Sequence, residues 1–139
     1  MRSRRSVLSA IGSGLILSAG CISQLKDDPK LKFESIGVFN KTEQPHELTV
    51  RMIEDGKTVF RTSERVKPAR NGDPGGHNFD QTWPTKPASY ELHAKLEEKD
   101  EWIKVGAELA DQGKCFNIRY MIDANGKLGV LQSPCSTSE

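Results

Sequence analysis

Short segments of alternating apolar and polar residues recur along this 139-residue chain. In the clearest of them, residues 90–96, the apolar side chains of Tyr90, Leu92, Ala94 and Leu96 alternate with polar ones. A period of two residues is typical of a β-strand that buries one face. No segment has the long 3.6-residue period of a helix. Further strand-like segments occupy residues 31–39, 48–52, 58–66, 102–109, 116–123 and 127–134.

This pattern predicts an all-β fold, an antiparallel immunoglobulin-like sandwich of two sheets with seven or eight strands. With 139 residues, of which 35% are hydrophobic and 6% aromatic, the chain can build one modest core but no large multidomain enzyme. The predicted domain covers residues 31–139. It lacks the Cys, Trp, Cys arrangement that joins the two sheets of antibody domains.

The last two predicted strands are flanked by Cys115 and Cys135 and joined by an Asn-Gly turn. If residues 124–126 form a three-residue loop, the two cysteines face each other across the hairpin. A two-residue loop at 125–126 would turn them to opposite faces, where no disulfide could form. We therefore predict the longer loop and a disulfide that stabilises the fold by about 3 kcal/mol. No Cys-x-x-Cys pair supports a redox centre instead.

The N-terminus has the pattern of an export signal. Arg4 and Arg5 precede an apolar run at residues 7–20, and Cys21 follows it directly. Fourteen residues are too few to cross the bilayer, which takes about 20, so the pattern predicts a signal peptide at residues 1–20. Residues 21–30 are mostly polar and predict a short tether.

Two motifs in this segment carry a family resemblance. The stretch Ser3–Leu8 resembles the twin-arginine export motif, and Leu17–Cys21 resembles a lipobox, although Ser18 stands where an aliphatic residue is usual. Together they resemble the exported lipoproteins of halophilic archaea, and the strand pattern is similar to the small immunoglobulin-like domains of archaeal surface lipoproteins. The resemblance implies a lipid on Cys21 and a place on the extracellular face of the cell membrane. A bacterial lipoprotein and an uncleaved amphipathic start remain alternatives.

The charge balance argues against nucleic acid as a partner. The chain has 20 basic and 19 acidic residues, and Arg2, Arg4 and Arg5 belong to the predicted signal peptide. The remaining 17 basic and 19 acidic residues leave a net charge of −2. Nucleic-acid-binding domains are normally basic, because they neutralise phosphates.

Catalytic and metal-binding motifs are missing from the sequence. A blue-copper site would need a histidine close to the last cysteine ligand, but His46, His77 and His93 all lie far from both Cys115 and Cys135. The chain also lacks the Gly-x-Ser-x-Gly and His-Glu-x-x-His motifs and a complete phosphate-binding loop. We therefore expect no enzyme activity, no metal and no cofactor.

Two candidate surface sites remain. Asn40, in the sequence Asn40-Lys41-Thr42, is a candidate glycosylation acceptor that we expect on an accessible loop. The segment after Pro68 is rich in glycine and polar residues, which predicts an exposed loop that is either a plain linker or a surface for a sugar or a peptide. The candidate binding residues in this loop are Asn71, Asp73, His77, Asn78, Asp80 and Trp83.

These observations favour a non-catalytic surface lipoprotein that acts as an interaction or cell-envelope module. Its expected partners are the membrane, through the lipid anchor, and another envelope protein. The alternative is a solute-binding or accessory subunit of a transporter or surface enzyme, with the loop at residues 70–83 as its mouth. A deep pocket among the loop residues would favour this alternative, and shallow grooves on a filled core would favour the first function. The sequence leaves the oligomeric state open.

Overall fold

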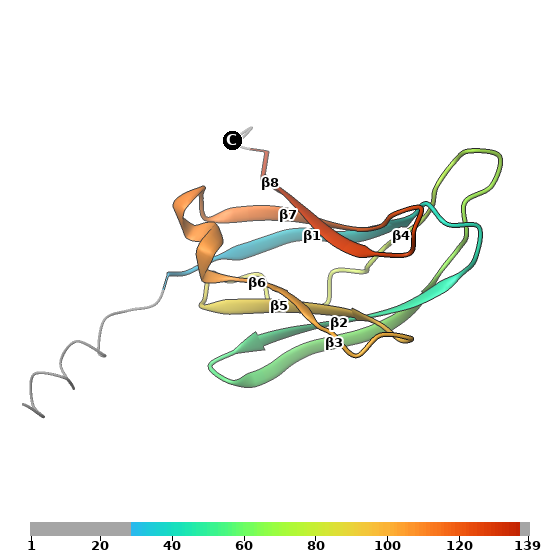
Figure 1. The fold of residues 1–139 in the computed structure, drawn as a ribbon. Helices are drawn as coiled ribbons and strands as arrows, with labels where there is room; N and C mark the ends of the chain where they lie inside the picture. Colours follow the sequence, from blue (N-terminus) through green and yellow to red (C-terminus); the bar gives the residue numbers. More distant parts are fainter. Residues whose placement is uncertain (1–28, 137–139) are drawn as a thin grey trace, which may run out of the picture.

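A computed structural model describes residues 29–136, which form two β-sheets packed face to face (Figure 1). One sheet has the strand order β4-β1-β7-β8 and the other β3-β2-β5-β6. Arg4, Arg5 and Cys21 lie outside the described residues. The elements are β1 (Lys32–Asn40), β2 (His46–Glu54), β3 (Lys57–Val66), β4 (Gly75–Asn78), β5 (Tyr90–Leu96), β6 (Ile103–Val105), the 3-10 helix η1 (Ala107–Asp111), β7 (Cys115–Ile122) and β8 (Leu128–Pro134).

The predicted two-sheet sandwich is confirmed, with eight strands in the described part of the chain. One pairing differs from the antiparallel expectation. Strand β1 runs parallel to β7, from the pair Lys32 and Cys115 to the pair Asn40 and Ile122, so this sheet is mixed. Alternation along a strand shows which side chains are buried, but it contains no information on the direction of a distant partner.

Two segments differ from their predicted structure. Residues 75–78, expected in an exposed loop, form the edge strand β4, which pairs with β1. A Cβ atom on Gly75 would lie 1.9 Å from the carbonyl oxygen of Lys67, so glycine lets the chain pass close to its own backbone here. The strand predicted at residues 102–109 covers only β6. The chain then forms η1, which buries Leu109 in the core.

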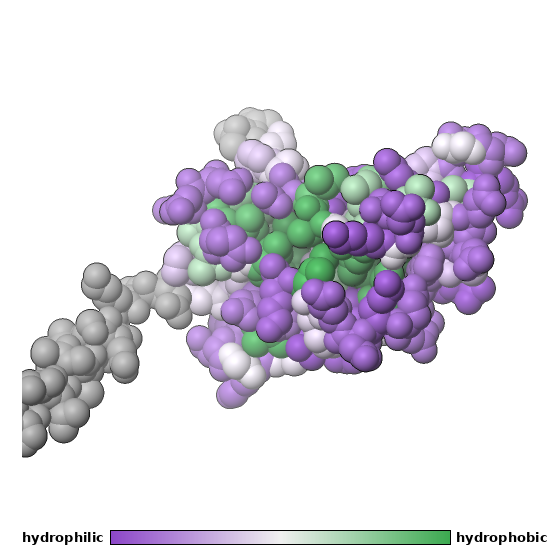
Figure 2. All heavy atoms as spheres, in the orientation of Figure 1, coloured by the Kyte–Doolittle hydropathy of each residue, from purple (hydrophilic) through white to green (hydrophobic). Residues whose placement is uncertain are grey.

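Inward-facing side chains of both sheets form one continuous core. In β5, for example, Leu92 and Ala94 are fully buried and Leu96 is nearly so, as the alternation predicts. Hydrophobic residues are visible in the band between the two layers, while hydrophilic residues cover most of the remaining surface (Figure 2). The half-buried side chains of Ile103, Leu128 and Val130, on the edge strands β6 and β8, pack against the margin of this core.

The C-terminal hairpin has the predicted register and disulfide. Phe116 faces Pro134, Ile122 faces Leu128, and Cys115 is bonded to Cys135. The backbone N–H of Cys135 also donates to the carbonyl oxygen of Cys115 at 3.0 Å. The disulfide therefore fixes the two chain segments at the open end of the hairpin.

Two buried tyrosines provide a matched test of hydrogen bonding in the core. The Tyr120 hydroxyl has no partner among the described residues, and burial raises the pKa of this group well above its ordinary value. The Tyr90 hydroxyl donates to the carbonyl oxygen of Lys86 at 2.8 Å. We expect Tyr90→Phe to lower the free energy of unfolding by about 1 kcal/mol, because it removes a hydrogen bond. We expect Tyr120→Phe to leave stability unchanged or raise it, because it removes an unpaired polar group.

Urea unfolding of both variants, with the disulfide intact, measures the difference. An equal loss in the two variants would show that the Tyr120 hydroxyl has a partner in solution.

Candidate functional site

The sandwich has two chemically distinct ends. At one, which we call the tether end, Pro29 lies close to Ser89, Leu31 pairs with Ala88, and the disulfide closes the last hairpin. At the other, which we call the loop end, four connections meet (Figure 1). Backbone hydrogen bonds from Ala69 to Thr42, from Lys41 to Ile122 and from Glu97 to Glu47 hold them together. The loop end consists of residues 41–45, 67–74, 97–102 and 123–127.

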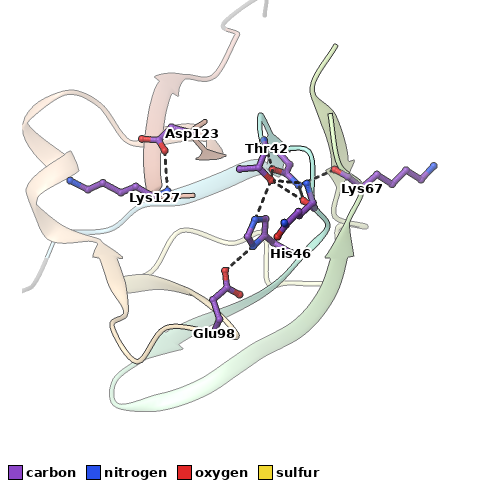
Figure 3. A network of polar contacts seen from close by, with 8 residues as sticks. Thr42, His46, Lys67, Glu98, Asp123 and Lys127 are labelled. Atoms are coloured by element: carbon purple, nitrogen blue, oxygen red, sulfur yellow. Dashed lines mark hydrogen bonds and ion pairs between the residues drawn. The ribbon is translucent and has the colours of Figure 1, made fainter. Parts of the chain in front are cut away.

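Asn40, the last residue of β1, is hydrogen-bonded to two of these loops. Its side chain is fully buried. The Nδ2 group donates to the carbonyl oxygens of Gln44 at 2.7 Å and Lys67 at 3.1 Å. Its Oδ1 atom accepts hydrogen bonds from the backbone N–H and the hydroxyl of Thr42, at 2.9 and 2.8 Å (Figure 3). One side chain thus satisfies polar backbone groups in both loops.

The expectation that Asn40 lies on an accessible loop was wrong. A glycan would have to be attached to the Nδ2 atom, which is buried and donates two hydrogen bonds in the folded domain. The Asn-x-Thr pattern instead forms a turn in which the asparagine oxygen accepts from the residue two positions later.

His46 connects this turn to a third loop. Its Nδ1 atom lies 2.7 Å from Oε2 of Glu98, and its Nε2 atom lies 3.1 Å from the hydroxyl oxygen of Thr42 (Figure 3). The side chain of His46 is 14% exposed and that of Glu98 is 45% exposed. The network therefore begins in the interior at Asn40 and ends at a solvent-exposed carboxylate, which makes the relative positions of the loops well defined.

The fourth loop is ordered by Asp123. Its Oδ1 atom accepts from the backbone N–H groups of Lys127 at 3.0 Å and Asn125 at 2.9 Å. The hydrogen bond from Lys127, followed by that from Asn125, holds the pKa of Asp123 below its ordinary value. Gly126, with φ of 83°, takes the left-handed conformation expected for the three-residue loop.

An open hollow of about 490 Å³ lies between this turn and the first loop. Such a surface can offer hydrogen bonds and charges to a large partner, but it does not enclose a small molecule. The lining residues are Lys41, Thr42, Glu43, Gln44, His46, Ala124, Asn125 and Gly126.

The six residues predicted to form one binding loop do not form one site. Asn71 and Asp73 lie at the loop end, and Asn71 has a positive φ of 56° in a tight turn. His77 and Asn78 belong to β4, which runs from the loop end toward the tether end. Asp80 follows β4 and is exposed. The prediction is wrong for Trp83, whose side chain belongs to the core.

The Trp83 side chain is only 3% exposed. Its indole N–H donates to the carbonyl oxygen of Phe33 at 2.8 Å, and its ring meets that of Phe60 edge-on, with 5.3 Å between the centroids. The composition around Trp83 predicted a loop, and the connection is irregular, but the ring itself turns inward. Loop composition does not reveal the direction of one large side chain.

Each histidine lies beside a different carboxylate. His46 contacts Glu98, His77 lies 3.7 Å from Glu64, and His93 lies 2.9 Å from Glu91. Within residues 29–136, the one group with the spacing of metal ligands is Glu34 with Cys115 and Cys135. The two sulfur atoms of this group are joined in the disulfide, so they are not available as thiolate ligands.

Sequence reasoning missed the network of Asn40, Thr42, His46 and Glu98. One signal for it was present, because an asparagine at the end of a strand followed two residues later by threonine is typical of a side-chain-capped turn. No local signal links His46 to Glu98, which is 52 residues away.

Comparison with known proteins gives no family for this chain, since neither a protein-family model nor a curated protein matches it. Across residues 29–136, no helix has the length and apolar character needed to cross a membrane.

Proposed function

We propose that this protein is a non-catalytic, lipid-anchored surface protein whose β-sandwich acts as an interaction or cell-envelope module. The observation that carries the proposal is the difference between the two ends of the domain. The described chain begins at the tether end, whereas the polar, hydrogen-bonded loops gather at the opposite end. A lipid on Cys21 would hold the tether end near the membrane and present the loop end to a partner.

The alternative, a solute-binding subunit, has less support. Its expected mouth was the loop at residues 70–83, but the residues of this loop are spread along the sandwich and Trp83 fills part of the core. The hollow between residues 41–46 and 124–126 is wide, and most of the residues that line it are polar. Sites for small molecules are usually concave and largely apolar, so this hollow is better suited to a macromolecule such as another envelope protein.

The anchor is tested by Cys21→Ser. We expect the variant to move from the membrane fraction to the soluble fraction, because it cannot receive the lipid and two acyl chains are what give stable anchoring. The Cys115→Ser/Cys135→Ser variant, which loses the disulfide but keeps Cys21, is the control and should remain with the membrane. Immunoblots of the fractions, with and without detergent, give the result.

Two outcomes would contradict the anchor. One is a Cys21→Ser variant that still requires detergent. The other is a soluble wild-type protein whose N-terminal peptide, detected by mass spectrometry, still contains Arg4 and Arg5.

A further inference from the structure

A row of basic residues crosses the outer face of the β3-β2-β5-β6 sheet. Arg61 on β3 is paired with Arg51 on β2, and Arg51 is paired with His93 on β5. His93 is in turn paired with Lys104 on β6. Side chains at paired positions lie on the same face of a sheet. With about 4.8 Å between neighbouring strands, the four residues span roughly 14 Å. We call them the basic row.

Arg51 is held in a fixed orientation at the centre of this row. Its Nε–H donates to Nδ1 of His93 at 3.0 Å, and its guanidinium carbon lies 3.8 Å from the ring centroid of Trp102. His93 is 5% exposed, and its other nitrogen, Nε2, lies 2.9 Å from Oε1 of Glu91. The hydrogen bonds among the described residues use only the Nε–H of Arg51, which leaves its two terminal nitrogens available to a ligand.

The permanent charges in the row, those of Arg61, Arg51 and Lys104, are uncompensated within the described part of the chain. Every ion pair among residues 29–136 involves a histidine. Arg61, Arg51 and Lys104 therefore have no carboxylate oxygen within 4.0 Å of their charged nitrogens. Arg51 and Arg61 face each other directly, an arrangement of like charges that destabilises a sheet. An anionic ligand would relieve this repulsion.

The surroundings of the row are also predominantly basic. The same face carries Arg65 and Lys95, and its carboxylates are Glu47, opposite Arg65, Glu91, beside His93, and Glu97, which continues the register opposite Glu47. Arg61, Arg65 and Lys104 are exposed, and Arg51 is half-buried. The face therefore presents five permanent cations and three carboxylates.

We propose that this face binds the phosphate groups of an anionic membrane surface. An arginine fork that is already oriented binds phosphate through two parallel hydrogen bonds, and tryptophan favours the membrane–water interface. The choice of a membrane rests on the proposed anchor at Cys21. The eight residue-to-residue steps from Cys21 to Pro29 span at most about 28 Å, which keeps the domain close to the lipid headgroups.

This binding mode also fits the loop end. The turn between β5 and β6 contains four carboxylates, which an anionic surface would repel. The basic face, with Trp102, would lie against the headgroups, while residues 41–45, 67–74 and 123–127 of the loop end stay accessible to a partner. The four acidic residues are Glu97, Glu98, Asp100 and Glu101.

The test measures how the full chain, carrying Cys21→Ser, partitions onto vesicles of phosphatidylcholine with and without phosphatidylglycerol. We expect Arg61→Gln/Lys104→Gln to lower the partition coefficient on anionic vesicles by about 30-fold, since each cation near such a surface contributes about 1 kcal/mol. The matched control, Lys41→Gln/Arg119→Gln, removes the same charge from other parts of the surface. It should change the coefficient by less than about threefold, because charges distant from the surface are screened.

Arg51→Lys tests the arginine fork, because it keeps the charge and loses the paired donors. We expect about a fivefold weaker partition and a smaller change in Trp102 fluorescence on binding. Equal losses in the row variant and the matched control, or equal binding to vesicles with and without phosphatidylglycerol, would overturn the proposal. A response of Trp102 to inorganic phosphate without vesicle binding would also overturn it, in favour of a site for free phosphate. The assay does not use the lipid anchor, and a high-salt wash of the membranes in the Cys21→Ser fractionation screens binding through the basic face, so the two results are distinguishable.

Discussion

Replacing Trp83 with alanine is expected to lower the free energy of unfolding by about 4 kcal/mol, because the change removes a large buried ring and leaves a cavity. The indole contacts Phe60 and donates to the carbonyl oxygen of Phe33, so the variant also leaves that carbonyl without its partner. Urea unfolding followed by far-ultraviolet circular dichroism gives the value without relying on tryptophan fluorescence.

Trp102 provides the control, because it is the second tryptophan of the chain and lies half-buried on an outer face. We expect Trp102→Ala to cost about 1 kcal/mol, mainly through the lost stacking with Arg51. A Trp83→Ala variant as stable as Trp102→Ala would mean that Trp83 is on the surface in solution. Trp83 would then be a candidate binding residue, as the sequence predicts.

The second large effect is expected at Asn40. Asn40→Asp keeps an acceptor for Thr42 but places a buried carboxylate against the carbonyl oxygens of Gln44 and Lys67, which now receive donated hydrogen bonds. We expect a loss of about 4 kcal/mol at neutral pH, because both hydrogen bonds disappear and a buried charge is left without a cation.

Asn78→Asp makes the same chemical change at an exposed position on β4 and should alter stability by less than about 0.5 kcal/mol. Thermal unfolding of the two variants side by side makes the comparison. Equal stabilities would contradict the role given to Asn40. So would a glycan on the Asn40 peptide of the exported protein, since the folded domain buries the acceptor nitrogen.

The parts of the fold predicted from sequence are those governed by local periodicity. The alternation of apolar and polar residues correctly predicted that Leu92 and Ala94 are buried. The same alternation predicted which face of the last hairpin packs on the core. The disulfide was predictable because the loop length fixes the register, and the register decides whether Cys115 and Cys135 face each other. Each of these inferences uses residues within one hairpin or one strand.

The candidate site could be predicted only in part. Loop composition correctly placed Asn71 and Asp73 at an exposed turn, but it failed for Trp83, whose partner Phe33 is 50 residues away. The glycine-rich edge strand β4 was missed because glycine has no side chain to show the alternation. In the basic row, Arg51 and Arg61 come from one hairpin, but His93 and Lys104 join them only through the pairing of β5.

The sequence by itself determined the fold class, the closing hairpin and its disulfide, and it supplies the motifs behind the proposed export signal. All of these depend on residues close together in the chain. The tertiary structure decided the parallel pairing of β1 with β7, the inward position of Asn40 and Trp83, and the alignment of the basic row. These features depend on which distant segments become neighbours, and that choice comes from burying all the apolar faces in one core at the same time.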